Sequence, residues 1–487
     1  MSPVETQRSK WLALALLATA QFVVVLDASI VNVALPSIGK DLHFSQDNLS
    51  WVVNAYTLFF GGFLLLGGRL ADLLGRRRMF IGGMVLFASA SLAGGLAQSE
   101  LWLIVARAVQ GLGAALVSPA ALSIVTTTFR EGAERNTALG VWGAVAGSGG
   151  AAGVLLGGML TQWAGWQWVL FVNVPIGLAA AALAPRLLAE SRDADRARHF
   201  DVAGAVTVTA GLAIGVYALV DANKAGWTST QTLGLGAVSL ALLGAFVVTE
   251  LRSRHPLVPF SIFRLQTLRG ANIVGLLLGM SLFAMFFFIS LYLQQVLGYS
   301  ALRTGFAYLP LALMIVVSAG GASQLVTRIG FKPTLIAGML LIGLALLWFS
   351  QVSVGGTYLG DVLFPSLIVA AGLGFAFVAT TIGAVTGTKP DEAGLASGLI
   401  NTSQQIGGAL GLAILSSVAN SRTSSVATSG EHNPLVALTD GFQTAFLVAA
   451  GFAVVGALLA AVLISSRDSR EQAAAAQRGE APQAVAV

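Results

Sequence analysis

The segment "AQFVVVLDASIVNVALP", from Ala20 to Pro36, places one carboxylate, Asp27, in an apolar run that extends from about residue 11 to residue 35. A run of about 20 apolar residues is long enough to cross the hydrocarbon core of a bilayer as a helix. An aspartate near the middle of such a helix costs roughly 2.5–3.5 kcal/mol on insertion scales. The segment therefore predicts a membrane helix in which the acid has a partner or a task that offsets this cost.

The composition extends this interpretation to the whole chain. Of its 487 residues, 56% are hydrophobic and 10% are charged, whereas a soluble domain carries about 25% charged residues. The first apolar run is too long for the core of a signal peptide, so we expect it to be a retained span. The net charge of +5 is not gathered on a soluble domain, and we expect the lipid bilayer, not nucleic acid, as the surroundings.

The residue types that support enzymatic or metal chemistry are scarce. The chain has no cysteine and four histidines, and no two histidines stand at a ligand spacing. We therefore expect no metal site and no cofactor. No nucleophile–base arrangement is evident either, and this argues against an enzyme.

Fourteen apolar runs are long enough to span a bilayer. They cover approximately residues 11–35, 51–74, 79–98, 101–125, 138–161, 167–188, 201–220, 231–250, 270–296, 304–326, 334–350, 358–386, 395–419 and 440–465. An even number places both termini on one side. If that side is the cytoplasm, its loops and tails hold 22 of the 27 lysine and arginine residues. The positive-inside rule therefore predicts a multi-pass protein of the cytoplasmic membrane with both termini in the cytoplasm.

An internal repeat divides these spans into two halves. A shift of 258 residues places Gly140, Gly149, Gly150 and Gly153 on other glycines, and a shift of 261 residues superimposes the "GLG" of 111–113 on that of 372–374. Duplicated halves with a site between them are a transporter architecture. The expected organisation is a cytoplasmic tail (1–10), a six-helix bundle (11–190), a linker with two inserted helices (191–255), a second six-helix bundle (256–465) and a disordered tail (466–487).

The loop "GRLADLLGRRRMF", Gly68–Phe80, connects the second and third spans. Gly68 removes a side chain where helices must touch, and Gly75 permits a tight reversal. Asp72 is close enough in sequence to pair with Arg76. The alternative is a charged loop whose arginines only anchor the orientation of the chain.

This loop resembles the signature "GxLaDrxGrk" of the major facilitator superfamily, with Leu73 in place of the usual basic residue. The resemblance implies an all-α membrane protein with the major-facilitator fold: two six-helix bundles plus two inserted helices, fourteen transmembrane helices in all. It also implies that the loop latches the two halves and gates their movement, which gives Gly68, Asp72, Gly75 and Arg76 a role in conformational gating.

Further motifs resemble those of the fourteen-helix drug:proton antiporter group of that family. They are "LDASIVNVALP" in the first span, "WVVNAYTL" from Trp51, "LIVARAVQGLGAA" from Leu103, "FVNVPIG" from Phe171 and "YLQQVLGYS" from Tyr292. The motif "GVLLGG" has Val154 where proline is usual, and its Gly153, Gly157 and Gly158 are expected to take part in gating through close packing. The resemblance implies export of drugs, antibiotics or similar compounds, driven by the proton gradient, and we expect a monomer.

Asp27 has a candidate partner in Arg107, a basic residue inside the fourth span that belongs to none of the loops or tails. Counted along their helices at 1.5 Å per residue, both lie ~10 Å below the same surface of the hydrocarbon core. Intramembrane charges pair with each other or face water. One hypothesis is that Asp27 takes up a proton from outside as substrate leaves and gives it to the cytoplasm before substrate binds again. The other is a fixed ion pair that never titrates.

Candidate substrate contacts come from several spans. The aromatic stretch 283–295 offers Phe287, Tyr292 and Gln295 to an amphipathic molecule, with cation–π contacts available. Polar candidates in the first half are Asn32, Asn54 and Gln110. Packing or contact with lipid is the alternative for the aromatic residues. The sequence thus predicts a proton-coupled exporter of amphipathic small molecules, and the alternative is an uncoupled or symport-type transporter of a specific metabolite.

Overall fold

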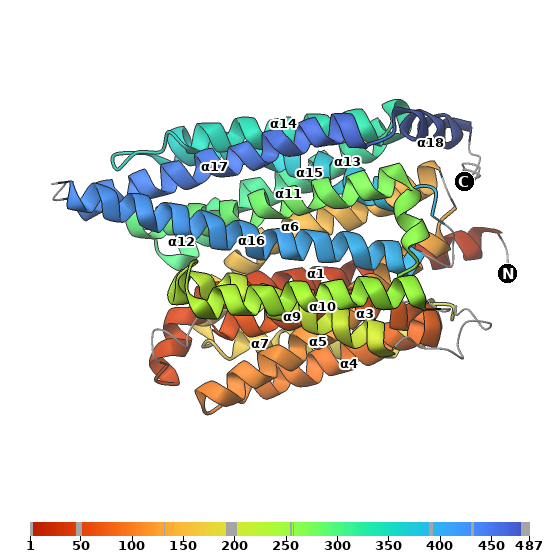
Figure 1. Cartoon of the computed structure of the whole chain (residues 1–487), viewed down its shortest axis with the longest axis horizontal. Coiled ribbons are helices and arrows are strands. Elements are labelled where there is room, and N and C mark those ends of the chain that lie inside the picture. Colours follow the sequence, from red (N-terminus) through yellow and green to blue (C-terminus); the bar gives the residue numbers. More distant parts are fainter. Residues whose placement is uncertain are drawn as a thin grey trace.

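The computed structural model describes residues 3–44, 51–130, 132–190, 202–253, 256, 258–388, 393–429 and 433–478. Within these ranges the chain is helical and has no strand. Figure 1 shows long helices that run side by side along one common direction, with the start of α1 and the end of α18 at the same end of the molecule. We call this the terminal end, and the other the opposite end.

The described residues of the first half of the chain form seven long helices and one short helix. In chain order they are α1 (Pro3–Asp41), α3 (Trp51–Leu74), α4 (Arg76–Gly95), α5 (Glu100–Thr128), α6 (Ala133–Trp163), α7 (Trp168–Phe171), α8 (Asn173–Leu187) and α9 (Val202–Ala225). The second half contains α10 (Thr230–Arg252), η1 (Phe260–Arg264), α11 (Gln266–Leu291), η2 (Tyr292–Val296), α12 (Ala301–Ala307), α13 (Leu309–Ile329), α14 (Phe331–Phe349), η3 (Tyr358–Leu363), α15 (Phe364–Val385), α16 (Ala393–Thr428), α17 (Pro434–Leu463) and α18 (Ser466–Arg478).

Eleven helices in the described residues are long and apolar enough to cross a membrane, or twelve if the bent α6 is one span. The bend in α6 is 41° and falls between Gly150 and Ala152, in a glycine-rich stretch of the kind that weakens a helix. The helix therefore bends without the proline that Val154 replaces. Helices α9 and α16 also lie where spans are expected, but α9 is apolar only over Ala203–Leu219. The fourteen-span count is consistent with the structure and stays a prediction.

Two groups of helices meet along glycine-rich faces. Helices α1, α3, α4, α5, α6 and α8 pack together, as do α11, α13, α14, α15, α16 and α17, and the groups touch where α6 meets α13 and α15 and where α16 meets α3 and α5. A Cβ atom added at Gly140 would lie 2.8 Å from the Cβ atom of Ser323, and one at Gly143 would lie 2.9 Å from Val378. Small residues thus let the two groups approach closely.

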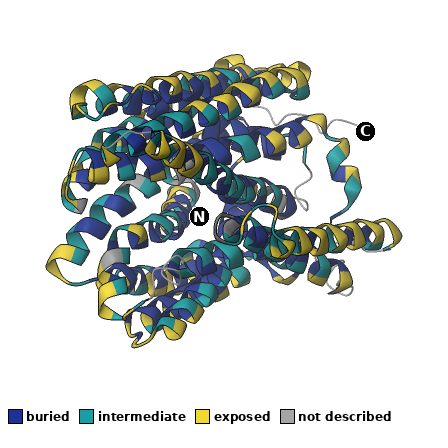
Figure 2. Cartoon of the chain, turned by 60° about the vertical axis from the view of Figure 1, so that its left-hand side comes forward, coloured by how far each residue is buried: buried dark blue, intermediate teal, exposed yellow. Residues whose placement is uncertain are grey.

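The pair α9 and α10 lies beside the seam between α3 and α16, because α9 packs against both. The outer face of α10 carries exposed apolar side chains, among them Leu233 (60%), Leu240 (72%) and Leu251 (69%). Figure 2 shows that exposed residues lie on the outer sides of the helices around the bundle, whereas buried residues lie toward its centre. Exposed leucines on a membrane helix are suited to contact with lipid.

The end of the chain differs from the expectation. The sequence predicts a disordered tail from residue 466, whereas Ser466–Arg478 forms α18, which packs on α13 and α14. Ser469, Gln472 and Ala473 are buried in this contact, and the backbone N–H of Lys332 donates to Ser469 Oγ at 3.0 Å. Alanine-rich segments look featureless in composition, but alanine is the best helix former and packs closely. Residues 479–487 lie outside the described residues.

Candidate functional site

Asp27 on α1 and Arg107 on α5 form an ion pair in the apolar interior of the first helix group. Arg107 Nη1 lies 2.5 Å from Asp27 Oδ2, and both side chains are 0% exposed. Arg107 Nε also donates to the carbonyl oxygen of Val52 at 3.0 Å, and its guanidinium lies over the Tyr56 ring, 4.4 Å from the centroid. The contact is the one that the equal depths of the two residues predict, and their role in proton coupling stays a prediction.

Neutral side chains complete the surroundings of the carboxylate. Asp27 Oδ1 accepts from Gln110 Nε2 at 2.9 Å and from Asn173 Nδ2 at 2.6 Å. Both amides also donate to Ser91 Oγ, at 3.0 and 3.1 Å, and Ser91 in turn donates to the carbonyl oxygen of Leu170 at 2.8 Å. Charge-assisted hydrogen bonds of this kind stabilise a carboxylate away from water.

Two polar atoms of this cluster have no hydrogen-bond partner among the described residues. They are Arg107 Nη2 and Asn173 Oδ1, both buried. A buried polar atom without a partner carries a desolvation penalty of about 1–3 kcal/mol. The cluster is therefore not saturated in this arrangement, although the carboxylate itself accepts three N–H groups.

Close packing of α5 on α3 brings Arg107 to its partners. A Cβ atom added at Gly111 would overlap the carbonyl oxygen of Tyr56 and would lie 3.1 Å from the backbone nitrogen of Phe60. On the other side of α1, Gly153 and Gly157 of α6 face the carbonyl oxygens of Leu26 and Ile30, at 2.7 and 2.6 Å from an added Cβ. The absence of a side chain at these glycines thus lets α6 pack closely on α1 next to Asp27. Gly158 is also buried.

Ser91 and Asn173 are members of the cluster that the sequence analysis did not select. Asn173 belongs to the quoted motif "FVNVPIG" and is the single strongly polar residue in it. A polar side chain isolated in an apolar run is the signal that could have found it.

The gating loop joins several elements at the terminal end. Arg76 Nη2 pairs with Asp72 Oδ1 at 3.0 Å, and both side chains are at most 8% exposed. Gly75 has φ of 111°, and an added Cβ there would lie 2.6 Å from Glu190 Oε1. Gly68 lies against Gly398 of α16: a Cβ atom added at Gly398 would lie 3.7 Å from the Cα atom of Gly68. The loop thus places a glycine contact between the two helix groups, while its gating role stays a prediction.

The remaining predicted substrate residues lie in different surroundings. Tyr292 is 1% exposed and its hydroxyl donates to the carbonyl oxygen of Ser353 at 2.7 Å. Gln110 is 1% exposed, with both ends of its amide engaged. These two are closed to a substrate in this conformation. Asn32, Gln295 and Phe287 are exposed and Asn54 is half-buried, so they are accessible, and their contact with a substrate stays a prediction.

A helical bundle that holds an ion pair in its apolar interior is typical of membrane transporters. Residues 17–412 match the model of the Major Facilitator Superfamily. The chain therefore belongs to this superfamily, and it is a multi-pass transporter of small molecules and not an enzyme.

Its relatives include proteins named for antibiotic resistance or export. The puromycin resistance protein pur8 of Streptomyces alboniger is 40% identical over 468 residues, which cover 94% of this chain and 92% of that protein. The cephamycin export protein CmcT of Amycolatopsis lactamdurans is 43% identical over 415 residues, 85% of each chain. The tetracenomycin C resistance and export protein of Streptomyces glaucescens is 35% identical over 416 residues, 85% of this chain and 77% of that protein.

Solved structures show the same fold at low sequence identity. The proton:xylose symporter XylE has a TM-score of 0.66 at 12% identity, covering 94% of this chain and 97% of that one. The human organic anion transporter MFSD10 (TETRAN) has a TM-score of 0.64 at 15% identity, with 94% and 100% covered. At these identities the likeness concerns the fold alone.

Proposed function

We propose that this chain exports antibiotics or other amphipathic small molecules across the cell membrane in exchange for protons, and that Asp27 carries the proton. The observation that carries this proposal is the fully buried Asp27 carboxylate, held by Arg107 and two amides inside a membrane-spanning bundle. Curated relatives at 35–43% identity are named for puromycin resistance, cephamycin export and tetracenomycin C export. These names support export as the direction of transport.

The exchange has two half-cycles. When the carrier is open to the outside, Asp27 takes up a proton and substrate leaves. When the carrier is open to the cytoplasm, Asp27 loses the proton and substrate binds. Each proton that enters is worth about 2.3 kcal/mol per 100 mV of membrane potential and about 1.4 kcal/mol per pH unit.

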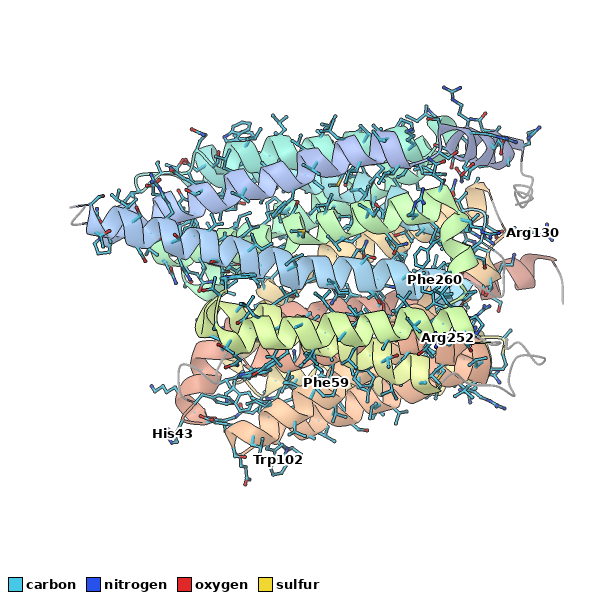
Figure 3. The ribbon with its side chains drawn as sticks, viewed as in Figure 1. His43, Phe59, Trp102, Arg130, Arg252 and Phe260 are labelled. Atoms are coloured by element: carbon cyan, nitrogen blue, oxygen red, sulfur yellow. The ribbon has the colours of Figure 1, made fainter. Side chains whose placement is uncertain are left out.

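The proposed orientation places the terminal end in the cytoplasm. Arg130 and Arg252 lie at this end, whereas His43 and Trp102 lie at the opposite end (Figure 3). The positive-inside rule assigns the basic end to the cytoplasm. Because the whole carboxylate cluster belongs to one chain, we further propose that the monomer is the working unit, with no cofactor beyond the proton gradient.

The test is accumulation of a lipophilic dye cation in inverted membrane vesicles with an acidic interior. For one proton exchanged per dye, one pH unit is expected to give about tenfold accumulation. Asp27→Asn keeps the shape of the side chain but cannot release a proton, and we expect it to bind dye without accumulating it. Asp221→Asn is the matched control, since Asp221 on α9 accepts from Gln231 at 2.8 Å near the surface.

Two results would contradict the proposal. If Asp27→Asn accumulates dye with an unchanged dependence on the pH gradient, Asp27 is part of a fixed ion pair and coupling lies elsewhere. If the wild-type chain moves substrate without regard to the gradient, or inward together with protons, the uncoupled or symport-type transporter is the correct function.

A further inference from the structure

The hydrogen bonds around Asp27 suit its charged form, because each of its three partners donates a hydrogen and none accepts one. Asp27 Oδ2 accepts from Arg107 at 2.5 Å, and Oδ1 accepts from the amides of Gln110 and Asn173 at 2.9 and 2.6 Å. All three partners present N–H groups, which donate and cannot accept. A neutral Asp27 must donate its O–H to an acceptor, so at least one of these partners has to change.

Arg107 cannot become an acceptor, because a guanidinium has donors only. Gln110 is held in its orientation. Its Oε1 accepts from Arg107 Nη1 at 2.7 Å while its Nε2 donates to Asp27 and Ser91. A half-turn of this amide would point N–H at N–H across the contact with Arg107 and would break that hydrogen bond.

Asn173 is under no such restraint. Its Oδ1 is buried and has no partner among the described residues, so a half-turn of the amide breaks no bond at that end. Ser91 tolerates either orientation. Its hydroxyl accepts from Asn173 Nδ2 at 3.1 Å and donates to the Leu170 carbonyl oxygen at 2.8 Å. After a half-turn of the amide, the single O–H of Ser91 can turn from the Leu170 carbonyl oxygen to Asn173 Oδ1.

We propose that Asn173 is a positioning residue whose amide changes its orientation with the protonation state of Asp27. Its amide donates N–H to the carboxylate and, after a half-turn, accepts the O–H of the neutral acid. This inference rests on the proposed function, in which Asp27 gains and loses a proton. The proton then sits on Oδ1, away from the Arg107 guanidinium, and Asn173 presents a hydrogen-bond partner to both charge states of the acid.

Among the described residues, the other elements that pack around Asp27 offer no side chain that could accept its O–H as easily as Asn173. The charged or titratable groups that face it from the described residues are Arg107 of α5 and Tyr56 of α3. The Tyr56 hydroxyl is engaged with the carbonyl oxygen of Val24 at 3.0 Å. Helix α4 contributes the neutral Ser91, and α6 contributes glycines.

The experiment is an infrared titration of the purified, full-length protein in liposomes. The carboxyl C=O band that is absent in Asp27→Asn reports protonation of Asp27 directly, without any substrate. Asn173→Leu removes a donor from the charged form and an acceptor from the neutral form, so we expect the midpoint pH to stay where it is while dye exchange slows. Gln110→Leu is the matched control. This amide only donates to Asp27, so its loss is expected to raise the midpoint by about one to two pH units.

The outcomes separate the two proposals. If Asn173→Leu raises the midpoint as far as Gln110→Leu does, Asn173 is a fixed donor and the inference is wrong, while proton coupling through Asp27 stands. If no band titrates in the wild-type protein, proton coupling through Asp27 fails and the inference fails with it.

Asn173→Thr is a second variant in case leucine prevents folding. The threonine hydroxyl both donates and accepts, so we expect an unchanged midpoint pH and faster dye exchange than with leucine. A midpoint raised by about one pH unit or more in Asn173→Thr would also overturn the inference.

Discussion

At the scale of single residues, the site depends on the shape of the guanidinium as much as on its charge. Arg107 contacts Asp27 and Gln110 through Nη1, the carbonyl oxygen of Val52 through Nε, and the Tyr56 ring through its planar face. A lysine ammonium is a compact point charge that cannot reach these groups together.

We therefore expect Arg107→Lys to keep an ion pair with Asp27 and to lose the contacts with Val52 and Gln110. The loss of these contacts is expected to lower the free energy of unfolding by about 1–3 kcal/mol and to slow transport. Thermal unfolding in detergent measures the first effect, and dye accumulation in vesicles measures the second. Arg186→Lys is the control, since Arg186 is exposed near the end of α8. Equal stability and transport in Arg107→Lys and the wild type would show that charge alone suffices.

Gly111 supplies the close approach that positions Arg107. We expect Gly111→Ala to push α5 away from α3, because the added methyl group overlaps the Tyr56 carbonyl oxygen. Overpacking of this kind costs about 1–3 kcal/mol. Gly320→Ala is the matched control, since nothing lies within 4 Å of an added Cβ there. Thermal unfolding of both variants checks the prediction, and equal unfolding temperatures would contradict it.

The predictability of the site also differs from residue to residue. Asp27 and Arg107 stand out because isolated charges in apolar runs are costly, and their depths follow from counting along the helix. Ser91 does not stand out, because small polar residues in membrane helices mostly serve packing, and Asn173 stands out only as a polar side chain in an apolar run. Which of them turns toward Asp27 depends on the rotation of α4 and α8, and one sequence does not define that rotation.

At the scale of the elements, α18 connects both helix groups at the terminal end. Gln472 Nε2 donates to Asn136 Oδ1 of α6 at 3.0 Å, and Asn136 Nδ2 donates to Thr327 Oγ1 of α13 at 3.0 Å. Gln477 donates to the carbonyl oxygen of Arg328, near the end of α13, at 3.0 Å. One short helix thus spans α6 and α13, whose separation must change if this end opens.

We expect a chain that stops after Ser465 to populate arrangements in which the terminal end is wider. Spin labels at Thr137→Cys on α6 and Ile329→Cys on α13 can report this distance, because the chain has no cysteine of its own. The distance distribution is expected to be narrow in the full-length protein and to broaden toward longer distances after truncation. Gln472→Leu is expected to give a smaller change in the same direction, since it removes only the contact with Asn136. Identical distributions in all three proteins would show that α18 does not hold this end together.

At the scale of the whole molecule, the placement of helices could be predicted and the way they meet could not. Apolar length alone locates long helices such as α11 and α17. The contact between α6 and α13, by contrast, depends on glycines such as Gly140 meeting Ser323, and such pairs are far apart in the sequence. Helix α18 differs from the sequence prediction for a related reason, because its buried face consists of alanine, serine and glutamine and gives no hydrophobic signal.

The orientation of the whole molecule is the last property to test, since it decides which end of the bundle receives substrate from the cytoplasm. Ser466→Cys places a thiol at the terminal end and Ser353→Cys places one in the loop between α14 and η3 at the opposite end, and both serines are exposed. In the proposed orientation the basic terminal end lies in the cytoplasm, so a membrane-impermeant maleimide on intact cells is expected to label Ser353→Cys alone. Permeabilised cells are the control, in which both variants are expected to react. Labelling of Ser466→Cys on intact cells would reverse the orientation and would place the opposite end of the bundle in the cytoplasm.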